Sequence, residues 1–320
     1  MQPPIRIRRL AAHVLIVFTL SVGFWQLPGF RLPVVAQEAL PATRLEIASV
    51  DTSSFPTLGL NLIVTDRQSR PRRELQALRV RENGAPVADY ENVSVTVGTD
   101  LILVVDASSR IQEADDEGGL TRLQKVKDSV LNYAGRFMDL AGRDHVTLIV
   151  PGEEAPRVLA DDVTAPAALI DAMQPYDPGR LPESNVEEML ALALERAAQR
   201  KDDGRFQAIV LYTDASGINE ALLRPLIEQA QGLQLPLFAL LLGGGEAPSE
   251  SAVETATALT EPTRGFFVHM PAASDSSELF QVVADNGVQS QVRYRSNIVR
   301  SGEHSLSVTL ENRRDEVTLD

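Results

Sequence analysis

Two polar sequences that each follow an apolar run carry residue types that bind divalent cations. Asp106 and Ser108 come directly after the apolar run Leu101–Val105, and Asp214 comes after a later apolar run, residues 208–212. Carboxylate and hydroxyl oxygens suit hard cations such as Mg²⁺. If both runs are strands of an open α/β sheet, their carboxyl ends lie at one edge, in the crevice where such sheets bind ligands. The sequence therefore predicts a cation site at this edge.

The segments around these residues alternate between strands and helices. Short runs of branched apolar residues indicate buried strands, and apolar residues at helical spacing indicate amphipathic helices, such as one from about Thr121 to Ala141. The alternation predicts an α/β fold over residues 99–288, a doubly wound and mostly parallel sheet with helices on both faces. Further strands are predicted at 146–150, 157–159, 237–242 and 266–268, and further helices at 165–173 (opened by Thr164), 186–197, 222–230, 253–259 and 279–283.

β patterning flanks this region on both sides. Residues 45–98 alternate between apolar and polar residues and contain an Asn83–Gly84 pair, which is a strong hairpin signal. Residues 291–320 alternate in the same way. In a doubly wound domain, the first strand begins and a closing helix ends on the side away from the carboxyl ends of the strands. The flanks are therefore predicted to join into one small β sandwich, with the α/β domain inserted into it.

The first 36 residues have the pattern of a signal peptide. Arg6, Arg8 and Arg9 precede an apolar run of about 14 residues, and small residues before Gln37 suit cleavage. A membrane anchor that stays attached is the alternative, although a span needs roughly 20 apolar residues. Residues 37–44 are predicted to be a linker. We expect the mature chain to be exported and soluble, either secreted or at the cell surface.

Composition narrows the possible partners. Removing residues 1–36 takes away four arginines and no acidic residue, which changes the net charge from −14 to −18. Nucleic acid is an unsuitable partner because phosphate neutralisation needs a basic face. The chain has no cysteine, so disulfides, thiolate metal sites and thiol nucleophiles are excluded.

The strand that ends in Asp106, the sequence SNVEEMLALAL from Ser184, and the strand that ends in LYTD at Asp214 together resemble a von Willebrand factor type A (VWA) domain. The resemblance covers about 99–288 and includes the order of strands and helices. The β module with its ENG turn also resembles a layout seen in bacterial exported proteins. The resemblance implies a protein-binding domain with a metal-ion-dependent adhesion site.

In the family, the first loop reads DxSxS, a threonine comes from a second loop and an aspartate follows the fourth strand. The resemblance implies that Asp106, Ser108, Ser184 and Asp214 hold Mg²⁺, or else Mn²⁺ or Ca²⁺, with Ser184 where threonine is usual. Arg110 replaces the third motif residue, a serine. A guanidinium about 5 Å from a dication is repelled by roughly 6 to 7 kcal/mol at an effective dielectric of about 20. Arg110 therefore either points into solvent or pairs with Asp106 or Asp214 itself, which leaves a vestigial site.

The residues next to this motif are predicted to form a rim around the site, where a ligand would bind. Ser109, Arg110, Glu113, Asp115 and Asp116 are assigned to it. The acidic residues of this run either hold a second cation such as Ca²⁺ or form a solvated loop.

No sequence feature indicates an enzyme. Ser216 lies outside a GxSxG motif, and the histidines lack metal-binding or catalytic spacing. We expect an extracytoplasmic protein-binding or adhesion module that captures an acidic side chain of another protein, with or without a divalent cation. The alternative is a metal-independent structural scaffold of a cell-envelope assembly.

Overall fold

A computed structural model describes residues 44–106, 109–115, 119–179, 185–299 and 302–319 of the 320-residue chain. The predicted signal peptide, residues 1–36, lies outside the described residues, as does the predicted linker except for Arg44. Among the described residues, no helix has both the length and the hydropathy that a membrane span requires.

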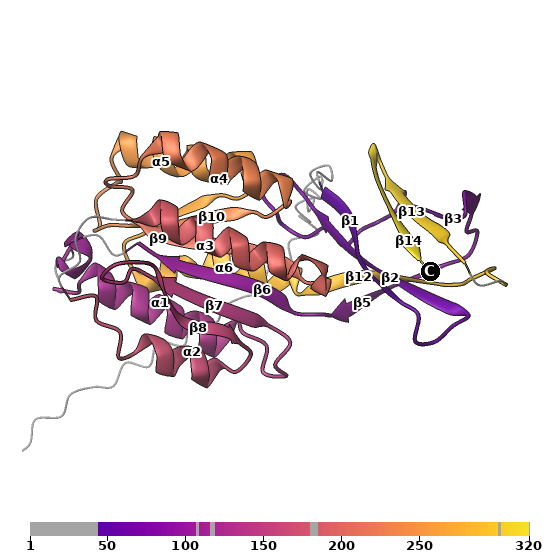
Figure 1. The fold of residues 1–320 in the computed structure, drawn as a ribbon, viewed down its shortest axis with the longest axis horizontal. Coiled ribbons are helices and arrows are strands. Elements are labelled where there is room, and N and C mark those ends of the chain that lie inside the picture. Colours follow the sequence, from indigo (N-terminus) through magenta and orange to yellow (C-terminus); the bar gives the residue numbers. More distant parts are fainter. Residues whose placement is uncertain (1–43, 107–108, 116–118, 180–184, 300–301, 320) are drawn as a thin grey trace, which may run out of the picture. The chain divides into compact units, whose positions relative to one another are not determined.

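A six-stranded sheet forms the centre of the α/β region, with the strand order β11-β10-β9-β6-β7-β8 (Figure 1). Neighbouring strands are parallel, except that β8 runs antiparallel to β7 at one edge. All residues of β6 are buried, as expected for a central strand covered on both faces. The strands are β6 (Thr99–Val105), β7 (His145–Val150), β8 (Arg157–Val163), β9 (Phe206–Thr213), β10 (Leu237–Leu242) and β11 (Phe267–Met270).

Helices cover both faces of this sheet (Figure 1). Leu101 and Leu103 of β6 pack on the side of α1, whereas Ile102 and Val104 pack on the side of α3, because successive strand residues point to opposite faces. One face carries α1 (Arg122–Arg136), α2 (Pro166–Met173) and α6 (Ser277–Asn286), and the other carries α3 (Val186–Gln199), α4 (Glu220–Gly232) and α5 (Glu250–Thr260). Short 3₁₀ helices are η1 (Ser109–Gln112), η2 (Lys201–Asp203), η3 (Glu261–Thr263) and η4 (Ala273–Ser276).

The two flanks form two four-stranded sheets with a shared apolar core. Strand β12, from the carboxyl-terminal flank, lies between β2 and β5 of the amino-terminal flank, and β13 pairs with β3. The first sheet has the order β1-β2-β12-β5, with β1 (Arg44–Asp51), β2 (Thr57–Thr65), β12 (Val288–Arg295) and β5 (Glu91–Thr96). The second has the order β14-β13-β3-β4, with β14 (Arg313–Leu319), β13 (His304–Leu310), β3 (Arg79–Glu82) and β4 (Ala85–Pro86). The predicted α/β fold class, with a small sandwich built from both flanks, is confirmed.

The chain enters and leaves the α/β region at one place. The backbone N–H groups of Val97 and Gly98 both donate to the Gly287 carbonyl, at 2.8 and 3.0 Å. The entry into β6 therefore lies beside the exit from α6. Because this junction is at the amino end of β6, the carboxyl edge of the central sheet is directed away from the sandwich (Figure 1).

The predicted helix from Thr121 to Ala141 is too long at its carboxyl end, because α1 ends at Arg136. The N–H of Asp139 donates to the Asp144 carboxylate at 2.7 Å, so it cannot continue the helical hydrogen bonding. Leu140, which lies within the predicted helix, is 87% exposed. The predicted cap of α2 is also displaced: its N-cap is Ala165 rather than Thr164.

Gly98 at the junction predicts a large effect on stability. It has a φ of +90°, and an added Cβ would lie 2.2 Å from the Arg143 carbonyl oxygen. We expect Gly98→Ala to destabilise the fold by about 3 kcal/mol, from the left-handed backbone and the displaced carbonyl together. Gly84 in the hairpin, with a φ of +77° and open space around it, is the control, and Gly84→Ala should cost only about 1 kcal/mol. Urea unfolding followed by circular dichroism measures both, and equal losses would contradict the role of the junction.

Candidate functional site

The carboxyl ends of β6 and β9 bring the two predicted aspartates to the same edge of the sheet. Asp106 directly follows β6 and is 2% exposed, and its N–H donates to the Tyr212 carbonyl of β9 at 2.8 Å. The Thr213 hydroxyl donates to Asp106 Oδ2 at 2.7 Å, and Asp214 is the next residue. The two strands thus hold both carboxylates in adjoining loops.

Both oxygens of Asp214 accept hydrogen bonds from protein groups. The backbone N–H of Ser216 donates to Oδ1 at 2.9 Å, and the Ser216 hydroxyl donates to the same oxygen. Arg122 Nη1 donates to Oδ2 at 2.7 Å, and Arg110 Nε lies 3.7 Å from that oxygen. The Asp214 side chain is 8% exposed, so two guanidinium groups neutralise a largely buried carboxylate.

The first turn of α1 supplies two of the cationic groups at this edge. Thr121 is the N-cap, and Arg122 and Lys125 are three residues apart, which places them on one face of the helix. Arg122 Nε donates to Asp115 Oδ2 at 2.9 Å while its Nη1 holds Asp214. Lys125, 1% exposed, donates to Asp115 Oδ1 and, at 3.1 Å, to the Gly243 carbonyl. Arg122 therefore bridges the loop after β6 to the loop after β9.

A buried hydroxyl network fixes α1 against the sheet beneath this bridge. Ser129 of α1 hydrogen-bonds to the Tyr212 hydroxyl at 3.0 Å and to the Ser276 hydroxyl at 2.8 Å. Burial raises the pKa of Tyr212 well above its ordinary value, so the phenol stays protonated. The network positions the first turn of α1 for its contacts with Asp115 and Asp214.

The remaining rim residues differ in their surroundings. Arg110 is 50% exposed and ion-paired with Asp214, which is one of the two arrangements expected from the sequence. Asp115 is part of the salt-bridge network rather than of a solvated loop, whereas Glu113 is exposed. Ser109 begins η1. Ser108, Ser184 and Asp116 lie outside the described residues.

The described side chains do not fit a divalent cation in this arrangement. Asp115 and Asp214 face three cationic groups, those of Arg110, Arg122 and Lys125. A dication on Asp214 would lie within about 5 Å of the Arg122 guanidinium, with a repulsion of roughly 6 to 7 kcal/mol at an effective dielectric of about 20. Binding would require Arg122 to leave Asp214. In the part of the chain that the structure describes, no group of three or more His, Asp or Glu side chains could hold a metal ion.

Sequence reasoning missed Arg122 and Lys125, although the sequence contains a signal for them. Basic residues in the first turn of a helix oppose the positive end of the helix dipole, and α1 has no acidic residue there. Two cationic side chains at such a position indicate that they pair with carboxylates outside the helix.

A cavity of about 220 Å³ opens beside the bridge. Arg110, Arg122 and Asp214 line one part of it, and His269 at the end of β11 lines another. His269 Nε2 is buried and has no hydrogen-bond partner among the described residues. It lies 3.0 Å from where a Cβ on Gly243 would stand, so His269 packs closely against the loop after β10.

Comparison with known proteins identifies the domain. The sequence model of the von Willebrand factor type A domain family matches residues 101–217, which run from within β6 through β7, β8 and β9 and include Asp106 and Asp214. The chain contains a VWA domain. VWA domains generally mediate protein interactions. No curated protein matches the sequence.

Several solved structures are also similar to this chain. The conserved hypothetical protein BatB from Bacteroides thetaiotaomicron is 15% identical, with a TM-score of 0.47 over 58% of this chain and 98% of that one. An aerotolerance-related membrane protein from Bacteroides fragilis is 12% identical, with a TM-score of 0.49 over 59% and 99%. A von Willebrand factor type A protein from Catenulispora acidiphila is 10% identical, with a TM-score of 0.46 over 88% and 71%.

The bridge predicts that Arg122 stabilises the VWA domain. Arg122→Ala would leave the largely buried Asp214 and Asp115 carboxylates with fewer cationic partners, and we expect a loss of about 3 kcal/mol at neutral pH. Arg314→Ala is the control, because the Arg314–Glu316 pair on β14 is exposed and should contribute less than about 1 kcal/mol. Urea unfolding compares the two. A loss for Arg122→Ala no larger than that of the control would show that the bridge does not hold the loops.

Proposed function

We propose that the chain is an exported, non-enzymatic protein-binding module that contacts its partner at the carboxyl edge of the VWA sheet without a bound divalent cation. The VWA domain supports a role in protein interaction. The edge lies at the end of the sheet away from the sandwich, so a large partner can approach it (Figure 1).

One observation carries the metal-independent form of this proposal. Arg122 Nη1 donates to Asp214 Oδ2 at 2.7 Å, with both side chains largely buried. A divalent cation would compete with this guanidinium for the same carboxylate oxygen. The bridge already joins Asp115, just before α1, to Asp214, just after β9, which is the structural task that a bound cation would otherwise perform.

The exposed part of the rim supports a proposal about how a partner is contacted. Arg110 and Leu120 are 50% and 45% exposed, and Glu113 lies between them in sequence. Arginine is enriched among the residues that dominate binding energy at interfaces. We propose that Arg110 contacts an acidic side chain of the partner, because its guanidinium matches a carboxylate in geometry.

The proposal predicts metal-independent capture of a partner. The chain, carrying a photo-cross-linker at Glu113, should capture the same protein in Mg²⁺ and in EDTA, because no metal contributes to the contact. Arg110→Glu should reduce capture at least about tenfold through charge reversal. Arg136→Glu, at the other end of α1, should leave capture unchanged. Mass spectrometry of the cross-linked product measures the yield.

Two outcomes of this experiment would contradict the proposal. Loss of capture in EDTA would support a cation-bridged contact instead. Equal capture by wild type and Arg110→Glu would show that the rim is not part of the interface. It would favour the alternative in which the chain acts as a structural scaffold of a cell-envelope assembly.

Export is supported by the sequence of residues 1–36, with its basic start, apolar run and small residues before Gln37. We expect the mature protein to be recovered outside the cytoplasm with an amino terminus at or near Gln37. Cell fractionation followed by amino-terminal sequencing checks this. A cytoplasmic protein that still begins at Met1 would contradict export, and an extracytoplasmic one that begins at Met1 would indicate a retained anchor.

A further inference from the structure

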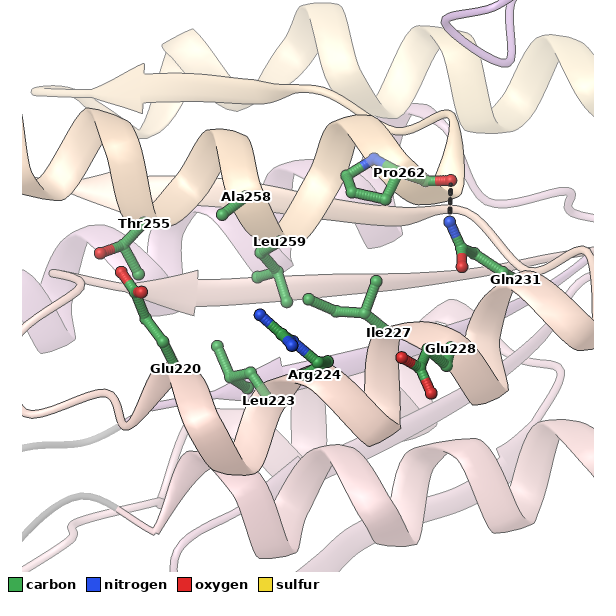
Figure 2. A pocket seen from close by; sticks show the side chains of 10 residues that line it. All are labelled: Glu220, Leu223, Arg224, Ile227, Glu228, Gln231, Thr255, Ala258, Leu259 and Pro262. Carbon is green, nitrogen blue, oxygen red and sulfur yellow. Dashed lines mark hydrogen bonds between the residues drawn. The ribbon is translucent and has the colours of Figure 1, made fainter.

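A groove separates α4 from α5 on the face of the sheet away from α1 (Figure 2). Its volume is about 390 Å³. Leu223 of α4 and Leu259 of α5 are buried at its floor, and Ile227 and Ala258 extend the apolar surface. A hydrogen bond of 2.9 Å from Gln231 Nε2 to the Pro262 carbonyl joins the two sides at one end.

The groove exists because α5 presents small side chains toward α4. The helix sequence ESAVETATALT contains only two large apolar residues, Val253 and Leu259. Thr255 and Ala258 line the groove where longer side chains would fill the space between neighbouring helices. The apolar floor is therefore not covered by the walls of the groove itself.

Charged residues follow one side of the groove at regular spacing. Glu220, Arg224 and Glu228 are four residues apart on α4, so they form one ridge with a charge of alternating sign about every 6 Å. Figure 2 shows Arg224 extending from α4 across the floor toward Leu259. Within the described residues, none of these three side chains has an ion-pair or hydrogen-bond partner. The intrahelical pairs of Arg224 with Glu220 and Glu228, which this spacing permits, are not formed.

We propose that this groove binds an amphipathic helix of a partner protein. The helix places apolar side chains on Leu223, Ile227 and Leu259, an acidic side chain against Arg224, and basic side chains one turn away on either side against the two glutamates. Charge complementarity with the ridge selects this pattern. The residues from Glu220 to Gln231 span about 16 Å, or three turns of a partner helix.

A helix suits the groove better than an extended segment does. The walls are helices whose own backbone groups are paired internally, so they offer no ladder of donors and acceptors. An extended segment on the apolar floor would leave its backbone N–H and C=O groups unpaired, whereas a helix satisfies them itself. The inference is independent of the rim, because the two surfaces share no residue.

A displayed peptide library tests this inference. The probe is a phage library of 18-residue helices with a fixed leucine face and varied charges. The library is selected for binding to the full chain and counter-selected against the Ala258→Trp variant. This substitution fills the groove from an exposed position. We expect selected peptides to carry an acidic residue beside the leucines with basic residues one turn away. Fluorescence anisotropy of a labelled peptide should show binding that Ala258→Trp and Arg224→Glu each weaken at least about tenfold.

Matched variants separate the groove from the rest of the surface. Ala221→Trp, on α4 outside the groove, and Arg314→Glu, on β14, should not change binding. A peptide with its acidic residue changed to lysine should regain affinity for Arg224→Glu. Three results would overturn the inference: no peptide survives the counter-selection, binding is unaffected by Arg224→Glu, or a peptide with a central proline binds equally well.

Discussion

The ion pair between Arg122 and Asp214 is the interaction on which the organisation of this VWA edge depends. It joins the first turn of α1 to the loop after β9, and the second nitrogen contact of the same guanidinium joins both to Asp115 in the loop after η1. The segment just before α1, the first turn of α1 and a loop 92 residues further along the chain therefore meet on one side chain. Lys125 completes the arrangement by holding Asp115 to the loop after β10 through the Gly243 carbonyl. The Arg122 and Lys125 side chains thus hold Asp115 and Asp214 with fixed positive charges that no change in metal concentration can remove.

The rest of the fold places this edge and leaves it accessible. The parallel strands deliver Asp106 and Asp214 to adjoining loops, and the hydroxyl network of Ser129 and Tyr212 sets the position of α1. The sandwich is attached at the opposite end of β6, where Val97 and Gly98 share the Gly287 carbonyl. The groove is a second surface of the domain. It lies beside α4 because the side chains that α5 presents there are small. The rim lies at the carboxyl edge of the sheet and the groove lies on one face of it, and the two surfaces share no residue, so binding at each is separable by mutation.

Much of the fold could be predicted from local sequence patterns, and the errors have local physical causes. Five consecutive apolar residues before Asp106 fix β6 as a central strand, and Asn83–Gly84 fixes the hairpin between β3 and β4. The length of α1 could not be predicted from periodicity, because Asp144 withdraws the Asp139 N–H from the helix. At the site, the sequence predicts Asp106, Asp214 and the conflict introduced by Arg110. The sequence does not by itself reveal that Arg122 pairs with the Asp214 carboxylate, since that contact depends on how α1 packs against β9.

A direct test of the metal-independent edge is a crystal structure of the chain grown in about 10 mM MnCl₂, a concentration well above the dissociation constants of functional sites for hard divalent cations. Anomalous scattering from manganese locates any bound ion without reference to its ligands. The account predicts no anomalous peak between Asp106 and Asp214, with Arg122 Nη1 within hydrogen-bond distance of Asp214 Oδ2. A peak at that position, with Arg122 turned away from the carboxylate, would contradict it.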